Sequence, residues 1–493
     1  MEVKSNLDDL RDLVERFMEE MALARYRAGA GLGEAGAVDS VIRRHNSLMD
    51  PAILEMVAEE SGTEEAGVSD ELRRALLFLH LDEEARPSTE RLMAEMRKAR
   101  LRVSGEDIPF LDSSRRIDAE GDRRKRALIA LARANKVAEW EPILQHRLAR
   151  LDEKSREMGR KGYGALLETE SGFDLAALEG QIGEFLARTQ DLYREVFSWL
   201  MKSRLGMDPA DAEHHDLRRA FRGEEFDSLL SEGQLLTALS NFTRAIQIDL
   251  QAAGRIEFDL EDRPGKQSRP FFSRVRVPDQ IILTAAPRRG HAHIRAWLHE
   301  LGHSLHYAYT SERVGFEGRL LGDNSVTEAF GFLMERLALE PRWLKRFAGM
   351  DEPVPFVQFA SAHRLYRLRR AAAQYQFELR LYREGVSTSL ADEYRVRLSE
   401  ACLCMVPRAF YLFNISPHLY SARHLRGWIL EAMLHRHLVH YFEEDWFRNP
   451  RAGQFLIRLW AEGQEGGADR IASQIGAESL DLQPLIEDFE KKF

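Results

Sequence analysis

The sequence predicts a mainly α-helical protein of two or more lobes, with one small β-sheet near the middle of the chain. Residues 38–205 and 356–445 carry the apolar spacing of amphipathic helices. Only the region 256–284 shows the alternation of apolar and polar residues that is typical of strands. A chain of 493 residues is also longer than one hydrophobic core normally supports, so a single compact lobe is not expected.

The chain opens with an amphipathic helix marked by regularly spaced apolar residues: Leu7, Leu10, Leu13, Val14, Phe17, Met18 and Met21. A glycine-rich loop, 28–36, follows, and its Gly31, Gly33 and Gly36 match the G-x-G-x-x-G pattern of dinucleotide-binding sites. That pattern binds a dinucleotide only where a strand precedes it. Because a helix precedes it here, we interpret the loop as a flexible connector.

The helical pattern continues to about residue 205, for example in 125–137 and 185–200, with interruptions at Pro87 and near Pro109. Within it lies a segment rich in basic residues: Arg115, Arg116, Arg123, Arg124, Lys125 and Arg126. A run of charges of this kind usually forms a solvated face. We therefore expect the segment 114–126 to be solvated and mobile.

Three short strands are expected in the middle of the chain, at 256–260, 275–277 and 281–284, with a turn at 263–265. This small sheet directly precedes the most informative motif of the sequence. The edge of such a sheet can hold an extended peptide by backbone hydrogen bonds.

The motif is His299-Glu300-Leu301-Gly302-His303, which has the H-E-x-x-H pattern of zinc hydrolases. Residues four apart share one helix face, so His299 and His303 can bind one metal, and Glu300 lies within reach of a water molecule there. The opposite face is apolar: Ile294, Trp297, Leu298, Leu301, Leu305 and Ala308. The helix therefore has a core face and a polar face for a cleft. The alternative is a chance match, with a structural pair of histidines.

A zinc site needs a third protein ligand, and Glu328, 25 residues after His303, is our candidate. Glu312, Glu317 and Asp323 are rival carboxylates. Glu328 also has a possible structural role, because Ser325 and Glu328 have the spacing of a capping box at a helix start. Spacing alone leaves these alternatives open.

The composition excludes several other classes of protein. A formal net charge of −10 and a pI of about 6.0 argue against nucleic acid or an anionic membrane as the main partner. The N-terminus lacks the apolar segment of a signal peptide, and no apolar run is long enough to span a membrane. Cys402 and Cys404 are too close together to form a useful disulfide, which favours a reducing, cytoplasmic location.

Four segments resemble the thimet oligopeptidase and oligoendopeptidase F family of zinc peptidases, and more distantly the angiotensin-converting-enzyme family. The segment 299–306 resembles the family's metal motif, and Glu328 and Glu335 match its ligand glutamate and a second glutamate seven residues later. The segment 259–266 is similar to its D-x-x-x-R-x-G-K sequence, and 159–163 to a helix-loop segment. The resemblance extends from about residue 155 to the C-terminus, with few matching residues between these segments.

The resemblance implies a bilobed helical zincin-type shell around a deep central channel, with one Zn²⁺ on its floor held by His299, His303 and Glu328. Residues 1–205 would then form an N-terminal lobe or lid, and 206–493 the catalytic lobe.

The chain departs from the family at two places. Tyr420 fits the first tyrosine of a tyrosine-rich segment that stabilises the oxyanion, but His424 and Gly427 stand where later tyrosines are expected. Gly331-Phe332 also replaces the Ser-Gln that follows the ligand glutamate in the family. We therefore expect the substrate preference and the catalytic rate to differ from those of the family's members.

The expected function is a zinc-dependent peptidase that cleaves short peptides, with Glu300 as general base and Tyr420 or His424 as oxyanion donor. His306 and Glu335 would orient the metal ligands. The alternatives are a carboxypeptidase or dipeptidyl carboxypeptidase of related fold, and a non-catalytic zinc-containing protein that binds peptides.

A second group of histidines, His435, His437 and His440, lies near the C-terminus. It can be a second metal site, but we expect a solvated helix face. The expected partners are short peptides only, and the sequence does not predict an oligomeric state.

Overall fold

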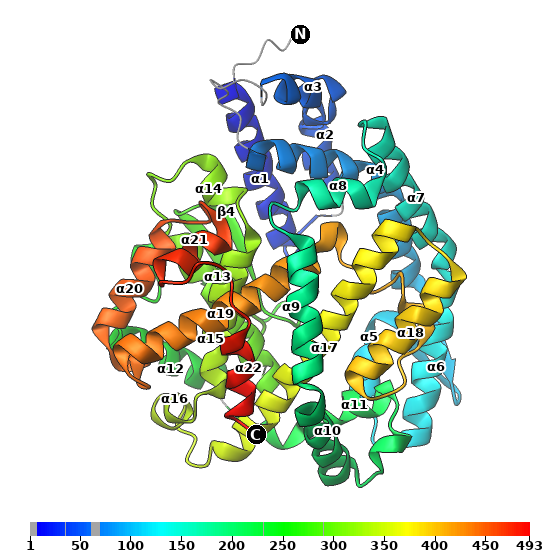
Figure 1. The fold of residues 1–493 in the computed structure, drawn as a ribbon, viewed down its shortest axis with the longest axis vertical. Coiled ribbons are helices and arrows are strands. Elements are labelled where there is room, and N and C mark those ends of the chain that lie inside the picture. Colours follow the sequence, from blue (N-terminus) through cyan, green and yellow to red (C-terminus); the bar gives the residue numbers. More distant parts are fainter. Residues whose placement is uncertain (1–6, 35, 61–69, 230, 289) are drawn as a thin grey trace. The chain divides into compact units, whose positions relative to one another are not determined.

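The computed structural model describes residues 7–34, 36–60, 70–229, 231–288 and 290–493 (Figure 1). It is 71% helix and 5% strand, and the described residues form 22 α-helices. The mainly α-helical class with a small sheet is therefore confirmed. No helix in the described ranges combines the length and apolar character that crossing a membrane requires.

The chain forms two compact units. The first comprises Met1–Leu77, Glu225–Ala360 and Arg426–Asp488, and the second Phe78–Glu224, Ser361–Leu425 and Phe489–Phe493. This division differs from the one expected at residue 205, because the N-terminal helix belongs to the same unit as the metal-motif helix. Four helices contribute residues to both units: α4 (Asp70–Lys98), α17 (Val354–Glu384), α19 (Tyr420–Phe442) and α22 (Gln483–Glu490).

The remaining elements of the first unit are ten helices and three strands. The helices are α1 (Leu7–Gly29), α2 (Ala37–Arg44), α3 (Pro51–Glu60), α12 (Glu232–Ala245), α13 (His291–Tyr309), α14 (Phe316–Leu320), α15 (Asn324–Glu335), α16 (Pro341–Arg346), α20 (Pro450–Ala461) and α21 (Gly467–Gln474). The strands are β3 (Ile256–Asp259), β4 (Phe271–Arg276) and β5 (Gln280–Thr284).

The sheet of the first unit has the order β3-β5-β4, with β3 parallel and β4 antiparallel to the central β5. The central strand is the most apolar, with Ile281, Ile282 and Leu283 all buried. Both β4 and β5 pack on α13, so the sheet holds one side of the metal-motif helix. The three predicted strands are thus confirmed, with boundaries shifted by a few residues.

The second unit contains a hairpin, β1 (Arg100–Val103) and β2 (Glu106–Pro109), and eight further helices. They are α5 (Phe110–Ala119), α6 (Arg123–Glu139), α7 (Glu141–Glu157), α8 (Tyr163–Glu170), α9 (Leu175–Arg188), α10 (Gln190–Leu205), α11 (His214–Ala220) and α18 (Thr388–Cys402). The helical prediction for 38–205 missed this hairpin. Its turn residues, Ser104 and Gly105, have φ angles of 51° and 83°, as tight hairpin turns require.

Two local predictions were wrong for identifiable reasons. The glycine-rich loop is packed rather than free: the Gln267 backbone N–H donates to the Gly29 carbonyl, and a Cβ on Gly31 would meet the Pro264 carbonyl oxygen at 2.5 Å. Pro87 does not interrupt the helical pattern, because α4 continues through it.

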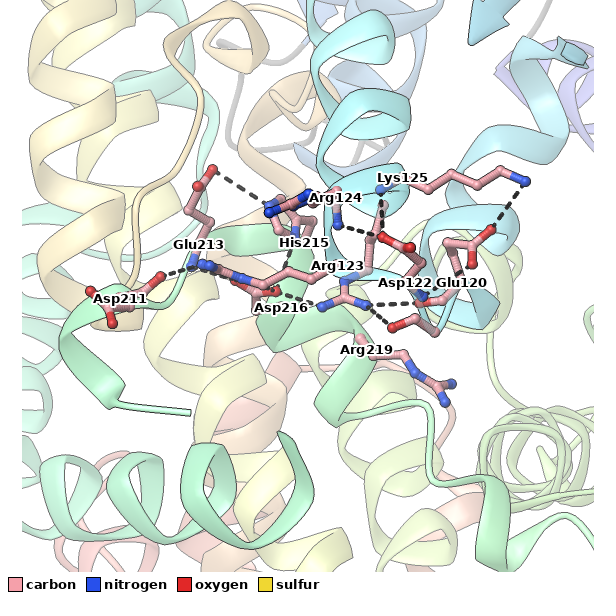
Figure 2. Close-up of polar contacts among 12 residues, drawn as sticks. Glu120, Asp122, Arg123, Arg124, Lys125, Asp211, Glu213, His215, Asp216 and Arg219 are labelled. Atoms are coloured by element: carbon pink, nitrogen blue, oxygen red, sulfur yellow. Dashed lines mark hydrogen bonds and ion pairs between the residues drawn. The ribbon is translucent and has the colours of Figure 1, made fainter. Parts of the chain in front are cut away.

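The basic segment 114–126 is solvated only in part: most of its arginines are exposed, among them Arg115 and Arg123, but Arg126 is buried. Arg126 is 3% exposed and donates a hydrogen bond to the buried carboxylate of Asp216. Arg123 donates to the same carboxylate (Figure 2). The partner lies about 90 residues away in the sequence, so local charge patterning could not reveal it.

Candidate metal centre

The helix α13 carries the H-E-x-x-H motif through the core of the first unit. It packs against α15, α20, β4 and β5, and its residues from Trp297 to Ala308 are all buried. The predicted apolar face is confirmed, since Trp297, Leu298, Leu301 and Leu305 are fully buried. The polar face is buried as well, which places charged groups in an environment where unpaired charges are costly.

On this polar face His299, His303 and Glu328 converge, the last from α15. Each offers one ligand atom, and these atoms lie within 4.8 Å of one another. The Nε2 atoms of the two histidines are 3.1 Å apart, and His299 Nε2 is 3.5 Å from Glu328 Oε2. Ligand atoms of a tetrahedral zinc with bonds of 2.0–2.1 Å lie about 3.3 Å apart. The three side chains therefore fit a zinc ion.

No other set of three metal-ligating side chains is found in the part of the chain that the structure describes. Glu312 and Glu317 are instead ion-paired with Arg255 and Arg11, at 3.0 and 2.8 Å. Asp323 caps α15 by accepting a hydrogen bond from the Ser325 N–H. The N-terminus of α15 is thus satisfied by Asp323, and the capping-box alternative for Glu328 is wrong.

Two glycines let α13 and α15 approach closely enough to bring the three ligands together. A Cβ on Gly302 would lie 2.3 Å from the Phe330 carbonyl oxygen. A Cβ on Gly331 would lie 2.9 Å from His299 Cε1 and 3.1 Å from His303 Nε2. Any larger side chain at either position would push Glu328 away from the histidines, so these glycines are required for the convergence.

A hydrogen bond orients the His303 ring, and an ion-pair contact orients the His299 ring. His303 Nδ1 lies 2.8 Å from Thr327 Oγ1, and His299 Nδ1 lies 3.4 Å from a carboxylate oxygen of Glu335. Arg295 in turn donates to Glu335 at 3.0 Å. Each ring thus directs its Nε2 at the other ligands, as metal-binding histidines do when a partner holds the second nitrogen. Thr327 and Arg295 were not predicted, because nothing local in the sequence marks them.

The electrostatics of the site favour a bound cation. Burial lowers the pKa of His299, but hydrogen bonds to Glu328 and Glu335 and their charges outweigh it and raise the pKa to about 9. Burial also raises the pKa of Glu300, against the lowering effect of the nearby positive charges. Two carboxylates beside a buried imidazole make a region of negative potential, and this is the environment in which a divalent metal is stabilised.

The strand β4 borders the site. Phe272 stacks on the His303 ring with centroids 4.7 Å apart, and its backbone hydrogen-bonds to Glu300. Among the described strands, β4 is an outer strand of the sheet. The strand that touches both a metal ligand and the acidic residue of the motif therefore has one edge without a neighbouring strand.

The residues that follow Glu328 on α15 and those near Gly427 on α19 lie against the ligands. Phe332 contacts the His299 ring, with centroids 4.9 Å apart, and stacks on Trp428. A Cβ on Gly427 would meet the Glu328 Cβ at 2.7 Å, so this position cannot hold a tyrosine without displacing the ligand. Gly331, Phe332, Gly427 and Trp428 therefore form one continuous wall around His299 and Glu328.

The other predicted site residues lie in different surroundings. His306 is buried and hydrogen-bonds through Nε2 to the Gly463 carbonyl oxygen at 3.1 Å, and burial lowers its pKa to about 4. Its neutral ring holds α13 against the segment that precedes α21, whereas orienting a ligand stays a prediction for this residue.

Tyr420 and His424 contact each other on the first turns of α19, with ring centroids 4.8 Å apart. They belong to the second compact unit, and their role as oxyanion donors stays a prediction.

Two further sequence features have structural roles. His435 pairs with Glu340 at 3.3 Å and His437 stacks on Phe455, so the described residues form no second metal group there. Lys266 donates to the carboxylate and carbonyl of Asp259, which closes the turn after β3.

The sequence matches no model of a known protein family and no curated protein.

Proposed function

We propose that this protein is a zinc-dependent peptidase that hydrolyses peptide bonds of short peptides. The observation that carries the proposal is the convergence of His299, His303 and Glu328 at zinc-ligand spacing, with Glu300 next to the first histidine. Three protein ligands leave a fourth position open, which is typical of catalytic rather than structural zinc sites. A bound zinc supplies Lewis acidity and lowers the pKa of water.

Glu300 has the place of a general base in this site. It follows His299 on α13, and its carboxylate is buried against the Phe272 backbone. A group held in this way can accept the proton of the attacking water and return it to the leaving amine. A purely structural metal site has no use for such a carboxylate.

An extended peptide is the substrate that this surface fits best. The outer strand β4 offers a backbone with which such a chain can pair, and Phe272 on that strand contacts His303. Such pairing depends on the peptide backbone and not on a particular side chain. We therefore expect the substrates to be short unstructured peptides as a class.

Digestion of a mixed library of short peptides, followed by mass spectrometry, tests the proposal. The zinc-loaded wild type should cleave peptides, and Glu300→Gln should retain zinc but lose activity by a factor of about 10² or more, because one group that transfers the proton is lost. Matched peptides with free and amidated C-termini would separate an endopeptidase from a carboxypeptidase.

Equal cleavage by Glu300→Gln and wild type, at equal zinc content, would contradict the mechanism. Zinc binding without cleavage of any peptide would favour the non-catalytic alternative.

A further inference from the structure

The second compact unit contains a cavity of about 300 Å³ between α5, α6, α11 and the segment 405–414. This size is at the lower end of the range of small-molecule sites in proteins. All its lining residues belong to the second unit, so it is separate from the metal centre described above. No residue of the proposed peptidase site lines it.

Three guanidinium groups line this cavity, those of Arg133, Arg218 and Arg370. Arg218 is neutralised by a bidentate pair with Asp118, at 2.7 and 2.8 Å. Arg133 donates only to neutral acceptors in the described structure, among them Ser113 Oγ at 2.7 Å. Arg370 makes no hydrogen bond or ion pair with any described residue.

The carboxylates nearby do not cancel this charge. The Asp216 carboxylate accepts hydrogen bonds from Arg123 and Arg126. It also contacts His215 Nδ1, and Glu213 lies 3.6 Å from His215 Nε2 (Figure 2). Figure 2 shows these contacts as one connected network at the start of α11. Glu213 lines the cavity and Asp118 pairs with Arg218, so the three lining arginines and these two carboxylates together carry one positive charge. Glu378, whose charge also acts on Arg370, lies outside the lining and accepts hydrogen bonds from the Ser416 N–H and the Ser421 hydroxyl.

The histidine beside this network responds to the same field. Burial, followed by the charges of Arg370 and Arg218, lowers the pKa of His214 to about 3. Burial and the charge of Arg218 likewise lower the pKa of Arg133 to about 10. His214 is therefore a neutral lining group at pH 7, and Arg133 keeps its charge.

The rest of the lining is apolar, and so is its rim. Leu131 and Met405 are 58% and 55% exposed although both border the cavity. Ile117, Ala134 and Val406 lie buried behind them. An apolar surface of this kind around a charged interior fits a ligand with an apolar body and one charged end.

We propose that this cavity binds a small amphipathic carboxylate, a single carboxylate group on an apolar body of about the size of a medium-chain fatty acid. The carboxylate would accept from the Arg370 guanidinium, and the apolar body would lie along Ile117, Ala134 and Val406. One carboxylate matches the one surplus charge, and a planar guanidinium binds a carboxylate with two parallel hydrogen bonds.

Calorimetric titration of octanoate into the full-length protein at pH 7.5 tests this assignment. Wild type should bind with saturation. Arg370→Met should bind about tenfold more weakly or worse, because a charge-assisted hydrogen bond is lost. Arg380→Met is the matched control, since Arg380 lies on the same helix but pairs with Glu384 and Glu393 outside the cavity. It should bind like wild type.

Ala130→Phe, which fills the cavity, should abolish octanoate binding. This variant tests the proposal if Arg370→Met does not fold, and unchanged binding by it would contradict the assignment of the cavity. His303→Ala, which removes a metal ligand, should bind octanoate unchanged, so failure of the proposed peptidase function leaves this test intact.

Absence of saturable octanoate binding, or equal affinity in Arg370→Met, overturns the proposal. Equal binding of octan-1-ol overturns the role of the carboxylate. Tighter binding of inorganic phosphate than of octanoate overturns the role of the apolar body.

Discussion

Small residues decide the geometry of the metal centre. Gly302, Gly331 and Gly427 each stand where a Cβ would meet an atom of α15 or of a ligand at less than 3.0 Å. A larger side chain at Gly331 or Gly427 would thus disturb the ligands directly. Phe332 and Trp428, stacked with centroids 4.5 Å apart, fill the neighbouring space. These five residues shape the metal site without binding the metal.

Gly331→Ala should weaken zinc binding. The added methyl would meet His299 and His303 and displace at least one ring from its place. We expect zinc affinity to fall about 10–100-fold, the range seen when the groups that orient metal ligands are disturbed. Competition with a chelator measures it.

Gly233→Ala is the matched control, because nothing lies within 4 Å of a Cβ at this position on α12. It should bind zinc like wild type. Wild-type affinity in Gly331→Ala would mean that α13 and α15 separate freely, and that their close approach does not hold the ligands.

At the scale of the elements, α11 depends on a buried charge. Asp216 is fully buried and accepts hydrogen bonds from Arg123, Arg126 and the backbone N–H of Glu213. Burial alone would raise the pKa of Asp216, but the hydrogen bonds from His215, Arg123 and Arg126 lower it well below its usual value. The ionised carboxylate therefore stabilises α11 against α6.

Asp216→Asn should lower the stability of the folded protein by about 3 kcal/mol at pH 7, because the buried Arg126 and the half-exposed Arg123 lose their ionic partner. A carboxylate with a lowered pKa stabilises fully above its unfolded pKa of about 3.9, and less as pH falls toward its folded value. The difference in melting temperature between wild type and Asp216→Asn should thus be largest at neutral pH and shrink below about pH 4.

Asp211→Asn is the control, because the backbone carbonyl of this exposed residue, not its carboxylate, accepts from Arg123. It should melt like wild type at every pH. A difference for Asp216→Asn that does not change with pH would show that the loss is one of packing rather than charge.

At the scale of the whole molecule, features carried by local periodicity were predictable from the sequence. The helical class, the three central strands and the pairing of His299 with His303 all depend on residues a few positions apart. The spacing alone left Glu328 as one of several candidate carboxylates for the third ligand. Its position beside His299 depends on the packing of α15.

The features that could not be predicted depend on contacts between distant segments. Thr327 lies beside the His303 ring from 24 residues away, and Asp216 accepts a hydrogen bond from Arg126, 90 residues before it. The return of residues 426–488 to the first unit also has no local signal, since it is set by burial against elements far earlier in the chain.

The measurement that tests the central claim most directly is the zinc content of the purified protein after loading with zinc and removal of excess ion. Wild type should carry about one zinc per chain, because three protein ligands are in place. His303→Ala should carry none. Thr327→Val, which removes the oxygen beside His303 Nδ1, should release zinc to a chelator about tenfold more readily than Thr327→Ser. Wild type without zinc, or His303→Ala with a full equivalent, would contradict the account.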